Sequence, residues 1–159
     1  MRTVFDSTQS QESKSEVSVR NRTRQCYTIF QALWVIGGVG SAMRKTEIVT
    51  EHGSTIGPDT PSMAGSSCAT HINATHGILI GIGNAYSNKE SLILNLETYH
   101  MEAGPELSIK RDHAACSKFG HVNGTEYIIV AGGWTSGTTT EILNISDNSG
   151  TWIAGKMLS

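Results

Sequence analysis

The sequence predicts an all-β protein built from four-stranded antiparallel units that follow one another as the blades of an open, partial β-propeller. Two observations predict this fold class. Three short apolar runs each end in glycine, and their last glycines, Gly38, Gly83 and Gly133, lie 45 and 50 residues apart. The same order of strand-like stretches surrounds every run, and a period of about 40 to 50 residues is typical of propellers.

Four strands are expected in each unit, all short, rich in Ile, Val and Leu, and bounded by Gly, Asn, Ser or Thr. The first strands carry a cysteine and are expected at 26–30, 68–72 and 116–119. The second strands are the glycine-terminated runs at 33–38, 78–83 and 128–133. The third strands are expected after a loop, at 46–49, 91–94 and 140–143. The fourth strands close the units at 54–57, 101–104 and 151–155.

The repeat is expected to extend over the whole chain. The segment 17–20 precedes Cys26 by the same spacing as 107–110 precedes Cys116. The polar N-terminal segment is therefore expected to belong to the repeat. We expect the tail of a preceding blade and then three blades, at 1–16, 17–58, 59–106 and 107–159. Because three blades cannot close a ring, apolar sheet faces are left open. Further blades or self-association are expected to cover those faces.

The paired glycines and one tryptophan resemble the Kelch repeat, whose blades carry two glycines after the second strand and a tryptophan near the fourth. The resemblance covers essentially the whole chain and is strongest in the third unit, while in the second unit Ile82 replaces the first glycine. It implies a propeller of about six blades. The residues that carry it, all expected to be structural, are Gly37, Gly38, Gly83, Gly132, Gly133 and Trp152.

These residue types also have a physical role that does not depend on the resemblance. Glycine adopts positive φ and allows close backbone approach where a strand bends sharply into a loop. Trp152 is expected to bury its ring against the neighbouring blade while its N–H group bonds a backbone carbonyl.

Composition excludes several classes of partner. The 159 residues carry a formal net charge of −2 with no run of Lys or Arg, so nucleic acid and anionic membranes are not expected to bind. No stretch approaches the roughly 20 apolar residues of a membrane span. Residues 1–16 lack the apolar core of a signal peptide, which favours the cytoplasm and leaves secretion open only if the true N-terminus is missing.

Cys26, Cys68 and Cys116 are expected to be free thiols. They are assigned to one equivalent site in successive blades. Packed sheets lie about 10 Å apart, whereas a disulfide tolerates at most about 7 Å between Cα atoms.

Four sequons for N-linked glycosylation begin at Asn21, Asn73, Asn123 and Asn144, and they would matter in a secreted protein. Asn73 and Asn123 fall in the same hairpin of successive units. Because asparagine is favoured in such turns, turn chemistry explains these two residues first.

We expect no catalytic residue, no metal and no cofactor. His71 and His76 flank a turn without a third ligand at a metal-binding spacing. Two alternatives stay open. One is a fragment of a Kelch-type copper oxidase that resembles galactose oxidase, which needs clustered Tyr, His and Cys side chains near the axis. The other is a degenerate fragment without independent function.

The leading hypothesis is a non-catalytic, protein-binding module, because a propeller presents the loops at one mouth of its ring as a rigid composite surface. Trp134 directly follows Gly133 in a loop of Ser, Thr and Gly, and tryptophan is enriched among interface hot spots. The candidate residues for contact with a protein partner are Met43, Arg44, Tyr86, Asn88, Trp134 and Ser136.

Overall fold

A computed structural model describes most of the chain from residue 25 onward. The described ranges are 25–29, 32–38, 43–83, 89–120, 123–134, 136–146 and 150–156. The expected tail of a preceding blade, 1–16, lies outside them. Within these ranges there is no helix, and therefore none long and apolar enough to cross a membrane.

The described strands form three antiparallel sheets of four strands each, in simple sequential order. The first sheet contains β1 (Gln25–Ile29), β2 (Ala32–Ile36), β3 (Thr46–Thr50) and β4 (Gly53–Ile56). The second contains β5 (Cys68–His71), β6 (His76–Ile82), β7 (Glu90–Asn95) and β8 (Met101–Ala103). The third contains β9 (Ala115–Gly120), β10 (Glu126–Ala131), β11 (Thr140–Asn144) and β12 (Trp152–Ala154).

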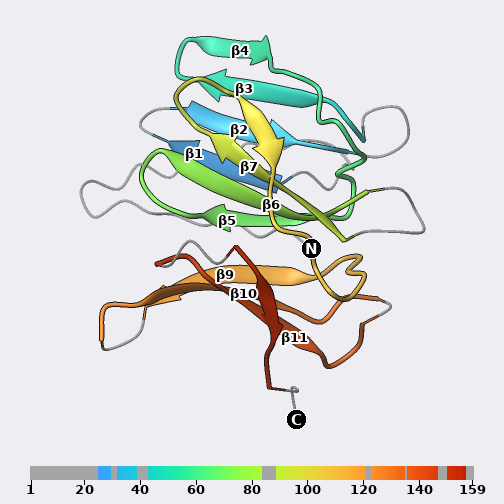
Figure 1. Ribbon diagram of the computed structural model, residues 1–159. Coiled ribbons are helices and arrows are strands. Elements are labelled where there is room, and N and C mark those ends of the chain that lie inside the picture. The colour runs from blue at the N-terminus through green and yellow to red at the C-terminus, as the bar shows by residue number, and fades with distance from the viewer. Residues whose placement is uncertain are drawn as a thin grey trace.

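The three sheets are stacked one after another as blades (Figure 1). The first strands of successive sheets contact one another, β1 against β5 and β5 against β9, as the innermost strands of propeller blades do. The protein is therefore all-β and forms an open, partial propeller, which confirms the predicted fold class.

Two apolar cores lie between the three sheets. The core between the first and second sheets includes Trp34, Ile36, Ile48, Leu79, Leu92 and Leu94. The core between the second and third sheets includes Cys68, Ile78, Ile80, Cys116, Ile128, Val130, Leu143 and Trp152. Because successive side chains of a strand point to opposite faces, β6 contributes to both cores and is apolar along most of its length.

Glycines with positive φ end the second strand of each sheet. Gly37 has φ +74° and Gly132 has φ +67°, in line with the predicted glycine pairs. In the second sheet the equivalent conformation belongs to Gly81, at φ +75°, and a β-bulge separates Ile80 from Ile82. The substitution of the first paired glycine by Ile82 is thus accommodated by moving the bend one residue earlier.

The expectation of free thiols is wrong for two of the three cysteines, because Cys68 and Cys116 form a disulfide with their Cα atoms 5.9 Å apart. In the third sheet, Cys116 pairs with Val130, and Val130 precedes the positive-φ Gly132 by two residues. In the second sheet, Cys68 pairs with Ile80, and Ile80 precedes the positive-φ Gly81 by only one residue. A shift of one residue turns a side chain to the other face of its sheet.

The two cysteines are therefore not equivalent, and they face each other across the interface between β5 and β9. The sheet separation of about 10 Å is an average over packed faces. It does not describe the innermost strands, which come closest to one another at the inner edge of the stack.

Trp152 has the role expected from the sequence. Its side chain is only 3% exposed and packs in the core between the second and third sheets. Its indole N–H donates a hydrogen bond of 3.0 Å to the carbonyl oxygen of Pro105, in the connection that leaves the second sheet. This tryptophan thus joins the last strand of one blade to the preceding blade.

The fourth strand of every sheet is closed by the same clasp. A hydroxyl group at the start of the third strand donates to a carbonyl oxygen just beyond the fourth strand. The three pairs, each at 2.7 Å, are Thr46 to Pro58, Ser91 to Pro105 and Thr140 to Lys156. The residue before each carbonyl is a glycine whose N–H donates back to the carbonyl oxygen of the same Thr or Ser: Gly57, Gly104 and Gly155.

Candidate protein-binding surface

The antiparallel order places two kinds of chain reversal at opposite ends of the sheets. One end, called the loop face here, holds the loops that follow β2, β6 and β10 and the connections that lead from one sheet to the next. At the other, the hairpin face, the odd-numbered strands terminate. Backbone hydrogen bonds tie the loop face together, from Ala64 N–H to Met43 and from Trp134 N–H to Asp112.

Met43 and Arg44 lie on the loop face, where both form hydrogen bonds within the protein. The Met43 carbonyl accepts the N–H of Ala64 at 2.8 Å. Arg44 Nε donates to the carbonyl of Thr60 at 2.7 Å, and the Arg44 carbonyl accepts the N–H of Thr60 at 2.8 Å. Arg44 is exposed and Met43 is partly buried. Both residues hold the connection between the first and second sheets against the loop after β2.

Trp134 is the most exposed large aromatic side chain among the described residues, at 86%. Its backbone is nevertheless fixed, because the Trp134 N–H donates to the Asp112 carbonyl at 2.7 Å. The loop continues into Ser136, which is buried and whose hydroxyl donates to the Gly132 carbonyl at 2.6 Å. Ser136 therefore shapes the loop, while Trp134 is the side chain that the loop presents.

The remaining two predicted contact residues, Tyr86 and Asn88, lie outside the described residues. The structure therefore brings Met43, Arg44, Trp134 and Ser136 to one face.

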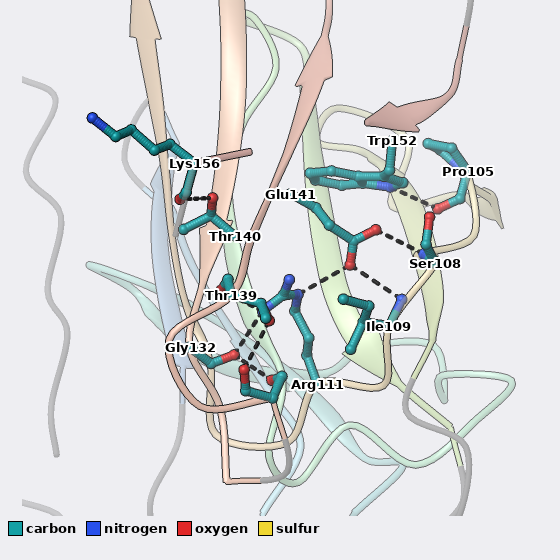
Figure 2. Close-up of polar contacts among 11 residues, drawn as sticks. Pro105, Ser108, Ile109, Arg111, Gly132, Thr139, Thr140, Glu141, Trp152 and Lys156 are labelled. Atoms are coloured by element: carbon teal, nitrogen blue, oxygen red, sulfur yellow. Dashed lines mark hydrogen bonds and ion pairs between the residues drawn. The ribbon is translucent and has the colours of Figure 1, made fainter. Parts of the chain in front are cut away.

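A buried ion pair lies beneath the Trp134 loop, and sequence reasoning did not find it. Arg111 and Glu141 are both 0% exposed, and Arg111 Nε lies 3.2 Å from Glu141 Oε1. Figure 2 shows the two side chains pointing toward each other between the connection that enters the third sheet and strand β11. A buried charge requires such pairing, because removing it from water is costly.

Backbone groups extend this ion-pair network (Figure 2). Glu141 Oε2 accepts the N–H of Ser108 at 2.7 Å, and Oε1 accepts the N–H of Ile109 at 3.2 Å. Arg111 Nη1 donates to the carbonyls of Gly132 and Thr139, at 2.8 and 2.9 Å. The last two carbonyls lie on either side of the Trp134 loop, so the ion pair holds both ends of that loop to the connection between the second and third sheets.

The sequence did contain one signal for this network. A glutamate within a short apolar strand occurs twice at the same place in the repeat, as Glu47 after Thr46 and Glu141 after Thr140. A charged residue inside a strand that otherwise supplies the core usually needs a buried partner. That argument predicts a pair but does not identify Arg111, which lies 30 residues away.

A polar pair lies next to the Trp134 loop. His113 Nδ1 is 2.7 Å from Asp112 Oδ1, and the His113 side chain is exposed. His113 has φ +60°, and its N–H donates to the carbonyl of Ser66 at 3.0 Å. Since the Asp112 carbonyl also accepts the Trp134 N–H, these groups form a polar rim beside the exposed indole.

His71, near the hairpin face, is a titratable residue whose surroundings disfavour its charged form. Burial, and secondarily the positive charge of Lys118, lower the pKa of His71 below its ordinary value of 6.5. Lys118 is held in place by the Ile72 carbonyl at 2.7 Å and by Glu126 at 2.8 Å. The folded state therefore favours neutral His71.

We expect the free energy of unfolding to fall as pH decreases below about 6.5, because the unfolded chain then binds a proton that folded His71 resists. Above that pH the effect vanishes. His71→Gln should remove this part of the pH dependence, and urea unfolding at about pH 7.5 and about pH 5.5 measures it. An identical loss of stability on acidification in wild type and variant would assign the dependence to other groups.

Within the described ranges, no three His, Cys, Asp or Glu side chains lie together in a way that could hold a metal ion. No protein-family model matches the chain, and no curated protein matches it. The class of protein is therefore defined by the structure itself, as an all-β, open, partial propeller with one exposed tryptophan on its loop face.

Proposed function

We propose that the chain is a non-catalytic, protein-binding module of the Kelch type, and that its partner docks on the loop face around Trp134. The observation that carries this proposal is the combination of an 86% exposed indole with a rigidly held backbone. Burial in a partner's pocket would remove the large apolar surface of an exposed tryptophan from water, and tryptophan is enriched among interface hot spots.

Preorganisation of the loop supports the same proposal. The ends of the Trp134 loop bond to Arg111, and Ser136 bonds back to Gly132, so these described residues are already held in place before a partner binds. His113 and Asp112 supply hydrogen-bonding groups at the rim, where protein interfaces are polar. The Kelch assignment is supported by Gly132, by Gly133 with φ +116°, and by buried Trp152.

The test compares partner capture by the wild-type chain, Trp134→Ala and Ile153→Ala. Ile153 is the matched control, because it is an exposed apolar side chain, at 59%, on edge strand β12. Proteins captured from the source cells by the wild type are identified, and the affinity of each chain for them is then measured with purified components. We expect Trp134→Ala to weaken binding about thirtyfold, the effect of losing one hot spot of about 2 kcal/mol.

Ile153→Ala should bind like the wild type. Thermal unfolding of Trp134→Ala should match that of the wild type, since exposed side chains contribute within about 0.5 kcal/mol of stability. Equal affinity of the wild type and Trp134→Ala for every captured protein would refute a binding site centred on this residue.

A further inference from the structure

Two sequons lie at the tips of equivalent turns on the hairpin face. Asn73 follows β5 and Asn123 follows β9, and both side chains are exposed. Each is followed two residues later by a threonine, Thr75 and Thr125. An Asn-X-Thr sequence on an exposed turn is the acceptor for N-linked glycans in proteins of the secretory route.

Both turns bring the carboxamide and the threonine together. Asn73 Oδ1 accepts the N–H of Thr75 at 2.9 Å and its hydroxyl at 3.1 Å. Asn123 Oδ1 accepts the N–H of Thr125 at 3.0 Å. This is the Asx turn, in which the asparagine side chain takes the place of a backbone carbonyl. In the turn of Asn73, the carboxamide and the threonine hydroxyl that define the sequon thus lie next to each other at the surface.

The disulfide is an independent observation that points to the same compartment. Cys68 and Cys116 lie on β5 and β9, the two strands that lead into these turns. Disulfides form and persist in oxidising environments such as the secretory route, and they are rare in the cytosol. A disulfide between β5 and β9 and two exposed sequons in the turns that follow these strands therefore support each other.

We propose that Asn73 and Asn123 carry N-linked glycans, acquired on the secretory route where the Cys68–Cys116 bond forms. This assignment replaces the cytoplasmic preference drawn from residues 1–16. In the transfer, a bond forms between asparagine Nδ2 and C1 of an oligosaccharide carried on a lipid pyrophosphate. The bond from C1 to the pyrophosphate oxygen breaks, the pyrophosphate leaves with the lipid, and Nδ2 loses one proton.

The proposal is confined to these two sequons. Asn144 is part of β11, where it pairs with Tyr127 and is half-buried, and Asn21 lies outside the described residues. Because glycans at Asn73 and Asn123 would cover the hairpin face, the loop face with Trp134 stays open to a partner. The glycosylation itself does not depend on the binding role of Trp134.

The experiment expresses the full chain behind a secretory leader in mammalian cells. Peptide mass mapping of total cell and secreted protein, before and after treatment with peptide N-glycosidase, reads the modified sites. We expect glycans on Asn73 and Asn123, the loss of one in Thr75→Ala and in Thr125→Ala, and the loss of both in the double variant. Thr75→Ser should keep its glycan. Transfer precedes export, so retained protein gives the same answer as secreted protein.

Asn95 is an internal control, because its Oδ1 accepts the N–H groups of Glu97 and Thr98 in a similar turn but no hydroxyl residue stands two positions later. It should be unmodified. Unmodified Asn73 and Asn123 in protein whose Cys68–Cys116 bond has formed would overturn the proposal. The glycan pattern of Trp134→Ala should match the wild type, so failure of the binding proposal and failure of this one are distinguishable.

Discussion

Replacing Cys68 and Cys116 together by alanine is expected to lower the free energy of unfolding by about 3–4 kcal/mol. The disulfide closes a loop with a sequence separation of 48 residues, which spans β5 to the start of β9. Opening it returns conformational entropy to the unfolded chain, and a loop of this length gives about 4 kcal/mol in the chain-entropy model. The bond also joins two blades that share one apolar core.

Urea unfolding with and without dithiothreitol measures this contribution. Reductant should lower the stability of the wild type to that of the double variant and leave the double variant unchanged. The non-reduced digest should contain a peptide that links the two cysteines. Equal stability of reduced and oxidised wild type would show that the bond does not hold the blades together.

Glu141→Leu is expected to cost about 3–5 kcal/mol, because it leaves the fully buried Arg111 without its counter-charge. It also removes the acceptor for the N–H groups of Ser108 and Ile109. The loss should extend to binding, since Arg111 holds both ends of the Trp134 loop.

Adding Arg111→Met to Glu141→Leu should recover part of the stability, because the uncompensated buried charge is then gone. Urea unfolding of both single variants and the double variant gives the coupling energy of the pair. Glu126→Gln is the matched control: Glu126 pairs with Lys118 at 2.8 Å on the surface, and its loss should cost less than about 1 kcal/mol. If Glu141→Leu were no more costly than Glu126→Gln, the buried pair would not stabilise the fold.

The sequence predicted the sheets well because their determinants are local. Apolar runs such as 128–133 end in glycines whose positive φ is required at the bend, and the period repeats them. The clasp formed by Thr46, Ser91 and Thr140 was not recognised, although each of these residues begins a predicted third strand. A hydroxyl at a strand end has many possible acceptors, and only the fold selects one.

The disulfide was mispredicted because the sequence alignment of the units placed Ile82 opposite a glycine. The chain instead bends at Gly81, and the resulting one-residue shift turns Cys68 toward Cys116. A shift of one residue cannot be recognised from repeats that are spaced about 40 to 50 residues apart. It nevertheless decides which face of a strand a side chain occupies.

The candidate site was predicted in part. The sequence singled out Trp134 from its position after Gly133, and the structure places it exposed on the loop face. Ser136 is buried and stabilises the loop, because its hydroxyl donates a hydrogen bond to the Gly132 carbonyl. The pairing of Arg111 with Glu141 joins residues 30 positions apart, and no local pattern specifies such a partner.

Site-specific photo-crosslinking tests the central claim, that a partner protein binds the loop face, most directly. A photoreactive phenylalanine derivative is placed at Thr138, an exposed position in the Trp134 loop, in one chain and at Glu51, an exposed position on the hairpin face, in another. We expect illumination in the source cells to give a discrete protein adduct from position 138 and none from position 51. An adduct from position 51 alone would contradict the account, because it would place the partner on the opposite mouth.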